Sequence, residues 1–148
     1  MKIGGNFGTT NGIITMLSLI TGLRATKVNK VGIIGAILAM IIADPLCDAY
    51  SIYYAEKTND NPNAYIIGRD AFISQFGLQL IILLIIVLTP NIDMGIYYCY
   101  IFGIIFTLLY GYKNNKDIQN IIMNMVWIFS LVVLTYVSDV MVYKLYKK

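Results

Sequence analysis

The sequence contains no histidine, which removes the side chain that most often serves as a metal ligand or as a general base near neutral pH. This absence argues against most hydrolytic mechanisms. No nucleophile–base pair and no cofactor motif stands in its place. We therefore expect that the protein is not an enzyme and that it holds no permanently bound cofactor.

Charge is also scarce. Charged residues make up 13% of the chain, against about 25% in typical soluble domains. Hydrophobic residues make up 58%, and the mean hydropathy is +0.70. A soluble fold of 148 residues could not bury so much apolar side chain and still cover its surface with polar groups. The composition predicts an integral, multi-pass membrane protein with a single domain, residues 1–148.

Cysteines are few, and basic residues are dispersed. Cys47 and Cys99 both lie in apolar segments, so there is no disulfide framework and no paired-cysteine metal motif. The net charge of +3 is small, and no basic stripe is present. Nucleic acid is therefore not an expected partner, whereas membrane lipids are.

Long hydrophobic runs are what the sequence has instead. A membrane-spanning helix needs about 20 mostly apolar residues, and four segments meet this requirement. The first segment has the length, but its first half, GGNFGTTNG, is polar. A cleaved signal peptide is the competing interpretation, and the thin charged region and missing A-x-A-like site favour a retained helix. We expect an all-α integral membrane protein, a five-transmembrane-helix bundle with spans at residues 3–23, 31–54, 71–89, 94–112 and 118–145.

The second span places polar side chains on one face of a helix. An ionisable group at mid-bilayer costs about 2.5–3.5 kcal/mol, so such groups face the bundle interior and are functional candidates. Carboxylate and carbonyl oxygens suit Mn(II) or Fe(II), whereas sulfur ligands add affinity for softer ions. The face therefore predicts either ion handling or polar packing between helices. It consists of Met40, Asp44, Cys47, Asp48 and Ser51.

Three features of this span bear on the choice. No lysine or arginine lies in the interior of the spans to pair with Asp44 and Asp48, which weakens the interpretation as a structural ion pair. Two carboxylates one turn apart repel each other when both are charged, which favours proton-linked binding. Pro45 between them has no N–H group and frees the carbonyl of Ile41 as a further oxygen.

Other spans carry polar residues as well. Asn11 in the first span needs a polar partner in lipid, and we expect it to line the same path. Gln75 and Gln79 lie one turn apart in the third span. Asp139 lies in the fifth span, near the end that could reach the headgroups.

Small residues recur at helical spacing in the first two spans. Gly4, Gly8 and Gly12 follow exact i+4 steps, which predicts a ridge that allows close helix approach. A similar ridge in the second span consists of Gly35, Ala39 and Ala43.

Two stretches resemble a known transporter family. TTNGIITMLSLITGL followed by GAILAMIIADPLCDAYSIYYAEK is similar to the first two helices of the vacuolar iron transporter family. Its members carry D-G-I/L-x-T/S and then A-D-x-x-S-M-A-x-G-E-Y. The resemblance is clearest over residues 5–57, and later rests on three apolar helices and on TYVSD.

The resemblance implies a five-helix homodimer with the ion path between the subunits and the N-terminus in the cytosol. It also implies movement of Fe(II) or Mn(II) out of the cytosol, in exchange for protons. The connection EKTNDNPNAYIIGRD is too short for the family's cytosolic metal-binding domain, so a compact member without that domain is expected.

Matched residue by residue, this chain rearranges the family's motif. Asp44 stands where the family has its second-helix aspartate, and Asn11 stands where it has the first-helix aspartate. Asp48 replaces methionine, Cys47 replaces serine, and Ile52 replaces glutamate. Glu56, one turn beyond Ile52, offers a further carboxylate near the membrane surface. The predicted metal ligands are Asp44, Asp48, Cys47, Met40, Asn11 and Glu56.

Three functions remain open at this point. The leading hypothesis is a membrane transporter of divalent metal ions that exports or sequesters Fe(II) or Mn(II) by proton exchange. The second is a diverged family member that no longer transports and serves as a structural or partner-binding membrane protein, because Asn11 and Ile52 remove two carboxylates. The third is an unrelated ion channel or small-molecule carrier, since polar intramembrane faces are not unique to metal ions.

Overall fold

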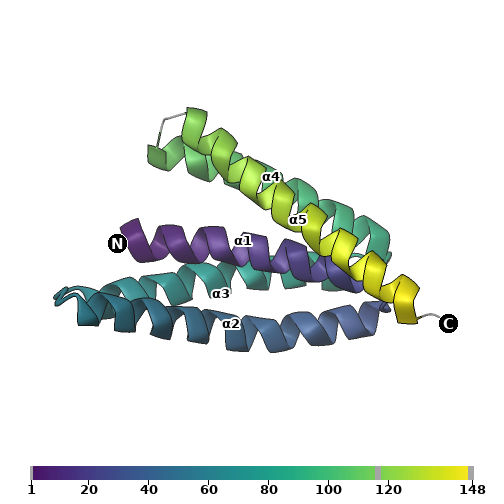
Figure 1. Cartoon of the computed structure of the whole chain (residues 1–148), viewed down its shortest axis with the longest axis horizontal. Helices are drawn as coiled ribbons and strands as arrows, with labels where there is room; N and C mark the ends of the chain where they lie inside the picture. Colours follow the sequence, from purple (N-terminus) through teal and green to yellow (C-terminus); the bar gives the residue numbers. More distant parts are fainter. Residues whose placement is uncertain (1, 116–117, 147–148) are drawn as a thin grey trace.

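The computed structural model describes residues 2–115 and 118–146, which form five α-helices and no strand (Figure 1). Each helix overlaps one of the five predicted segments. The helices are α1 (Lys2–Ala25), α2 (Lys30–Thr58), α3 (Ala64–Leu88), α4 (Ile92–Asn115) and α5 (Ile118–Tyr146).

Four helical stretches in the described residues are long and apolar enough to cross a membrane: Lys30–Thr58, Ala64–Leu88, Ile92–Lys113 and Met125–Leu145. Helix α1 has 24 residues but is not among them, and its first half is polar and rich in glycine. Large apolar side chains such as Leu46, Leu84 and Leu145 are exposed on the outer surface. The architecture is consistent with an all-α, multi-pass membrane protein.

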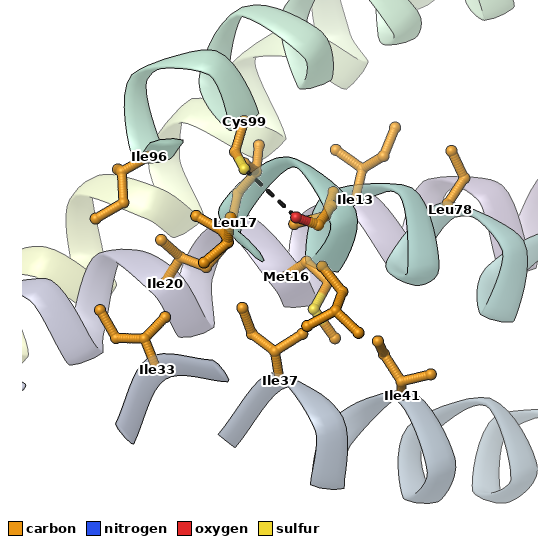
Figure 2. Packing of buried hydrophobic residues seen from close by; sticks show 13 residues of the cluster. Ile13, Met16, Leu17, Ile20, Ile33, Ile37, Ile41, Leu78, Ile96 and Cys99 are labelled. Atoms are coloured by element: carbon orange, nitrogen blue, oxygen red, sulfur yellow. Dashed lines mark hydrogen bonds between the residues drawn. The ribbon is translucent and has the colours of Figure 1, made fainter. Parts of the chain in front are cut away.

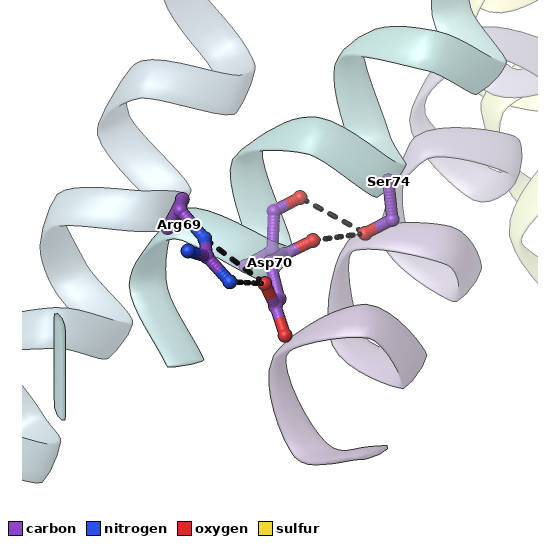
Figure 3. A network of polar contacts seen from close by, with 4 residues as sticks. Arg69, Asp70 and Ser74 are labelled. Atoms are coloured by element: carbon purple, nitrogen blue, oxygen red, sulfur yellow. Dashed lines mark hydrogen bonds and ion pairs between the residues drawn. The ribbon is translucent and has the colours of Figure 1, made fainter. Parts of the chain in front are cut away.

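Helix α3 begins at Ala64 rather than at the expected residue 71, so two charged residues lie within it. Arg69 Nη2 lies 2.9 Å from Asp70 Oδ1, and the Ser74 hydroxyl donates to the Asp70 carbonyl at 2.8 Å (Figure 3). Arg69 and Asp70 form this ion pair within the second turn of α3, and the helix continues through the polar GRD segment. Sequence reasoning placed the boundary too late because it followed hydropathy alone.

Tight turns join consecutive helices. Lys27 ends α1 with a positive φ of 61°, and the Val28 N–H donates to the Leu23 carbonyl at 3.0 Å. This is the hydrogen-bond pattern that commonly ends helices. Asn29 then caps α2, because its side chain accepts from the Gly32 N–H at 2.8 Å. Such short connections make neighbouring helices antiparallel.

Helices α1, α2 and α3 form the principal packing unit, with α3 in contact along both α1 and α2 (Figure 1). The hairpin of α4 and α5 crosses this unit obliquely. In it, α5 packs on α1, whereas α4 contacts α3 and, to a smaller extent, α1. The N- and C-termini lie at opposite ends of the bundle.

The apolar core lies between α1, α2, α3 and the first half of α4 (Figure 2). On α2 the buried residues recur every fourth position and end at Pro45, so the proline faces inward. The Cys99 thiol is buried and lies 3.9 Å from the Ile82 carbonyl oxygen, to which it donates. The remaining core side chains include Ile13, Met16, Leu17, Ile20, Ile33, Ile37, Ile41, Leu78, Ile86 and Ile96.

The glycine ridge of α1 lies against the backbone of α3. A Cβ atom at Gly4 would overlap the Ile67 carbonyl, and one at Gly8 would overlap the Ala71 carbonyl. At Gly12 it would stand 3.3 Å from Gln75 Cγ. Only residues without a Cβ atom allow the two helices to approach this closely.

The second small-residue ridge does not pack within this chain. Ala39 and Ala43 are exposed, and a Cβ atom at Gly35 would meet nothing within 4 Å. The cause is the row of isoleucines on the same helix, including Ile37 and Ile41, which occupies the inward face. The ridge therefore faces outward.

Replacing single glycines in α1 separates helix contact from helix propensity. We expect Gly8→Ala to lower the free energy of unfolding by about 1–3 kcal/mol, because the methyl group overlaps the α3 backbone. Gly5→Ala is the matched control, since its Cβ atom would meet nothing within 4 Å. It should be neutral or add up to about 1 kcal/mol through better helix propensity. Denaturant titration of both variants in detergent micelles measures this, and equal effects would contradict close α1–α3 packing.

Candidate functional site: a carboxylate and amide cluster

Five polar side chains from three helices meet inside the bundle. Asp44 and Asp48 come from α2, Gln75 and Gln79 from α3, and Asn11 from α1. Residues four apart lie on the same face of a helix. Because α2 and α3 lie side by side, their two pairs face each other. We call this group the polar cluster.

Gln75 is the centre of the polar cluster. Its Nε2 atom donates to Asp44 Oδ2 at 2.7 Å and to Asp48 Oδ2 at 2.8 Å. Gln79 Nε2 donates to the same Asp44 oxygen at 2.7 Å. The Asn11 amide of α1 donates to Asp48 Oδ2. One amide therefore holds both carboxylates, and each carboxylate receives a second amide.

The two glutamines are fully buried, with 0% of each side chain exposed, whereas the two aspartates are half-buried. The Oε1 atoms of Gln75 and Gln79 have no hydrogen-bond partner among the described residues. An unsatisfied buried polar group costs about 1–3 kcal/mol, so two such oxygens in one cluster call for an explanation.

Among the described residues, no basic side chain forms an ion pair with Asp44 or Asp48 of the cluster. The sequence has no lysine or arginine at residues 3–23, 31–56 or 70–88, and Arg69 donates to Asp70. The carboxylates depend on amide dipoles alone. Hydrogen bonds from neutral donors to a carboxylate are stronger than neutral pairs, but they do not cancel its charge. The cluster is therefore suited to a mobile positive charge.

Three predicted ligands lie outside the polar cluster. Cys47 is exposed on the surface of α2, and Met40 packs against the apolar core. Glu56 accepts a hydrogen bond at 2.5 Å from the Asn61 amide, at the end of α2. No group of three or more cysteine, aspartate or glutamate side chains lies together in the part of the chain that the structure describes. The side chain of Asp139 lies outside the described residues.

A groove begins one turn from the polar cluster. It has a volume of about 390 Å³ and lies between α1, α2 and α5. Its α1 wall extends from Thr15, one turn beyond Asn11, to Thr26 at the end of the helix. Four hydroxyl side chains contribute to it. The lining is Thr15, Ser18, Leu19, Gly22, Leu23, Thr26, Met40 and Thr135.

Polar contacts between α1 and α4 were not expected from the sequence. The Tyr110 hydroxyl donates to Asn6 Oδ1 at 2.7 Å, and Tyr100 and Thr21 share a hydrogen bond between their hydroxyls. Periodicity gives no sign of which helix a tyrosine will reach, so this pairing needed the structure.

The direct link between the glutamines and the aspartates was also missed. Both pairs are spaced i, i+4 on consecutive helices. Matching polar pairs on antiparallel neighbours were the available signal, but the register between the helices was unknown. The structure supplies that register.

The fold and the cluster define an all-helical protein with an apolar surface and an uncompensated pair of carboxylates inside. No protein-family model, no curated protein and no solved structure matches the chain. The resemblance to the vacuolar iron transporter family therefore rests on the sequence motifs alone, and function has to be inferred from the site.

Proposed function

We propose that the protein is a membrane transporter of divalent metal ions, with Fe(II) or Mn(II) as substrate and the polar cluster as the binding site on its path. The observation that carries the proposal is the meeting of Asp44 and Asp48 with three amides inside an apolar bundle, without a basic partner.

Charge balance favours a divalent substrate. Two ionised carboxylates and one divalent cation sum to zero, which is the least costly state for a group inside the bilayer. Carboxylate and amide oxygens are suitable ligands for Mn(II) and comparable ions. When no cation is present, protons can neutralise Asp44 and Asp48, so exchange of metal for protons follows from the same chemistry.

The groove, with four hydroxyl side chains in a mostly apolar wall, leads from the polar cluster toward the Thr26 end of α1. Thr15 lies one turn from Asn11 and Met40 lies one turn from Asp44, so the groove starts beside the polar cluster. Hydroxyl oxygens along a groove can replace part of the hydration shell of a passing cation. We propose that ions move between the polar cluster and the Thr26 end along this route.

Reconstitution in liposomes tests transport. We expect the protein to take up Mn(II) faster than empty vesicles do, and faster still when the vesicle lumen is acidic. Asp44→Asn combined with Asp48→Asn should reduce uptake to the level of empty vesicles, because the site then lacks both charges. Asp60→Asn removes a carboxylate from the exposed α2–α3 turn, where φ is 55° and asparagine is tolerated, and serves as control. Uptake that persists in the double variant would contradict the proposal.

We extend the proposal to five membrane spans, with α1 as the fifth. The support is the 24-residue length of α1 and its extensive contact with α3. Helix α3 is itself long and apolar enough to cross the membrane. Asn11 and the polar half of α1 would then face the bundle and not lipid. Five spans place the termini on opposite sides of the membrane. Epitope tags at the two ends should therefore differ in protease accessibility in intact vesicles, and equal accessibility would contradict the arrangement.

A homodimer, which the family resemblance implies, completes the proposal. Its support is the outward ridge of α2, where Gly35, Ala39 and Ala43 would allow a second copy to approach closely. The exposed Cys47 stands one turn further along the same ridge, whereas Cys99 is buried. Mild oxidation in membranes should therefore link two chains through Cys47. Cys47→Ser should abolish the link and Ala43→Leu should weaken it, and a monomeric mass without any link would contradict the dimer.

One observation favours the non-transporting alternative. The amide hydrogens already satisfy one oxygen of each aspartate, as they would in polar packing that only holds helices together. A protein with this role would bind no Mn(II) in calorimetry, and the double aspartate variant would remain folded and associated with its partners.

A further inference from the structure

The most informative atoms of the polar cluster are the two glutamine oxygens. Gln75 and Gln79 are fully buried, yet each uses only its N–H₂ end toward the aspartates, and each Oε1 atom has no partner among the described residues. Polar packing alone would favour side chains that satisfy both ends. The cluster thus contains two unused oxygens beside two carboxylates.

We propose that Gln75 and Gln79 turn their amides when a divalent cation enters, so that their oxygens become ligands next to Asp44 and Asp48. This inference rests on the proposed function and adds to it the ligand set and the ion class: an all-oxygen site for hard divalent cations. The sulfur atoms of Cys47 and Met40 take no part.

The geometry supports such a turn. The terminal torsion of glutamine is broad and nearly two-fold, so rotation exchanges the nitrogen and oxygen positions with little movement of the rest. The oxygen of Gln79 would then occupy the place from which Nε2 now reaches Asp44 Oδ2 at 2.7 Å. Two oxygens at that separation repel each other unless a cation lies between them.

Cation entry therefore decides the orientation. With the N–H₂ group toward the carboxylates, the oxygen of each amide has no partner. With the oxygen toward a bound cation, the N–H₂ group has none. Each glutamine therefore has one unsatisfied end in both orientations. The empty site prefers the N–H₂ groups toward the carboxylates, because they stabilise the negative charge. The occupied site prefers the oxygens. A ligand shifts an equilibrium by its differential interaction with two states, and the cation supplies that difference here.

The ligand set also predicts selectivity. In the empty site all four Nε2 and Nδ2 donations go to the Oδ2 atoms of the aspartates, and when the glutamine amides turn, three of these donations end and the Oδ2 atoms become free to bind the cation. Carboxylate and amide oxygens suit Mg(II), Ca(II) and Mn(II), whereas soft ions such as Cd(II) gain most from thiolate or thioether ligands. Cys47 faces outward and Met40 packs into the core, so neither supports soft-ion binding in the cluster.

Substitution of Gln79 by leucine or by glutamate distinguishes a ligand from a hydrogen-bond donor. Mn(II) affinity can be measured by electron paramagnetic resonance on the purified protein in nanodiscs, with Mn(II) alone as the probe. Gln79→Leu should weaken binding about tenfold or more, since it removes an oxygen ligand. Gln79→Glu should restore or exceed the original affinity, because it returns an oxygen.

A donor role predicts the reverse order. Glutamate cannot donate to Asp44 and adds a third negative charge, so a site that needs Gln79 only as donor would lose more affinity and stability in Gln79→Glu than in Gln79→Leu. That order would overturn the inference. Gln75→Leu and Gln75→Glu repeat the comparison at the central amide, so misfolding of one variant does not decide the outcome.

Two further results separate this inference from the proposed function. Cys47→Ser should leave the affinities for Mn(II) and Cd(II) unchanged, and thiolate-to-cadmium absorption in the ultraviolet at the site would overturn the all-oxygen assignment. If the unaltered protein binds no Mn(II), both proposals fail. If it binds and transports Mn(II) while all four glutamine variants keep their affinity, only the role of the glutamines fails.

Discussion

Two carboxylates that face the interior of an apolar bundle constrain the rest of the structure. Asp44 and Asp48 have no basic residue in the neighbouring helix segments, so their hydrogen bonds have to come from neutral donors. Gln75 can serve both only if α2 and α3 run side by side in one register. The extensive contact between these two helices is therefore a requirement of the polar cluster as much as a result of apolar packing.

The same glutamine connects the polar cluster to the packing of α1. The side chain of Gln75 lies directly beneath Gly12, where an added Cβ atom would stand 3.3 Å from its Cγ, and its amide holds both aspartates. Close approach of α1 also brings Asn11 to Asp48. The glycine ridge and the amide donors thus depend on each other: a wider separation of α1 and α3 would remove one donor and loosen the residue that organises the others.

Much of this arrangement follows from the sequence, because its strongest signals are local. Hydropathy placed the five helical segments, and i+4 spacing grouped Asp44 with Asp48 and identified the ridge at Gly8. What the sequence could not provide is register between helices. The sequence therefore did not predict that Gln75 contacts the aspartates. It also grouped Cys47 and Met40 with Asp44 and Asp48, whereas in the structure Met40 packs against the core and Cys47 is exposed. Hydropathy also began the third segment too late, after the GRD segment, whereas α3 begins at Ala64 and includes the Arg69–Asp70 ion pair.

The resemblance to the vacuolar iron transporter family gains a physical meaning when charge is counted. Where the family places an aspartate on the first helix and a methionine on the second, this chain has Asn11 and Asp48. The exchange moves one carboxylate from the first helix to the second and replaces a soft ligand by a hard one, while Ile52 in place of the family's glutamate lowers the number of carboxylates in the motif from three to two. The amide of Asn11 remains within hydrogen-bond reach of the relocated charge. The two carboxylates that remain, Asp44 and Asp48, still suffice to balance one divalent cation, and the preference of the site shifts from mixed oxygen and sulfur ligands toward oxygen alone.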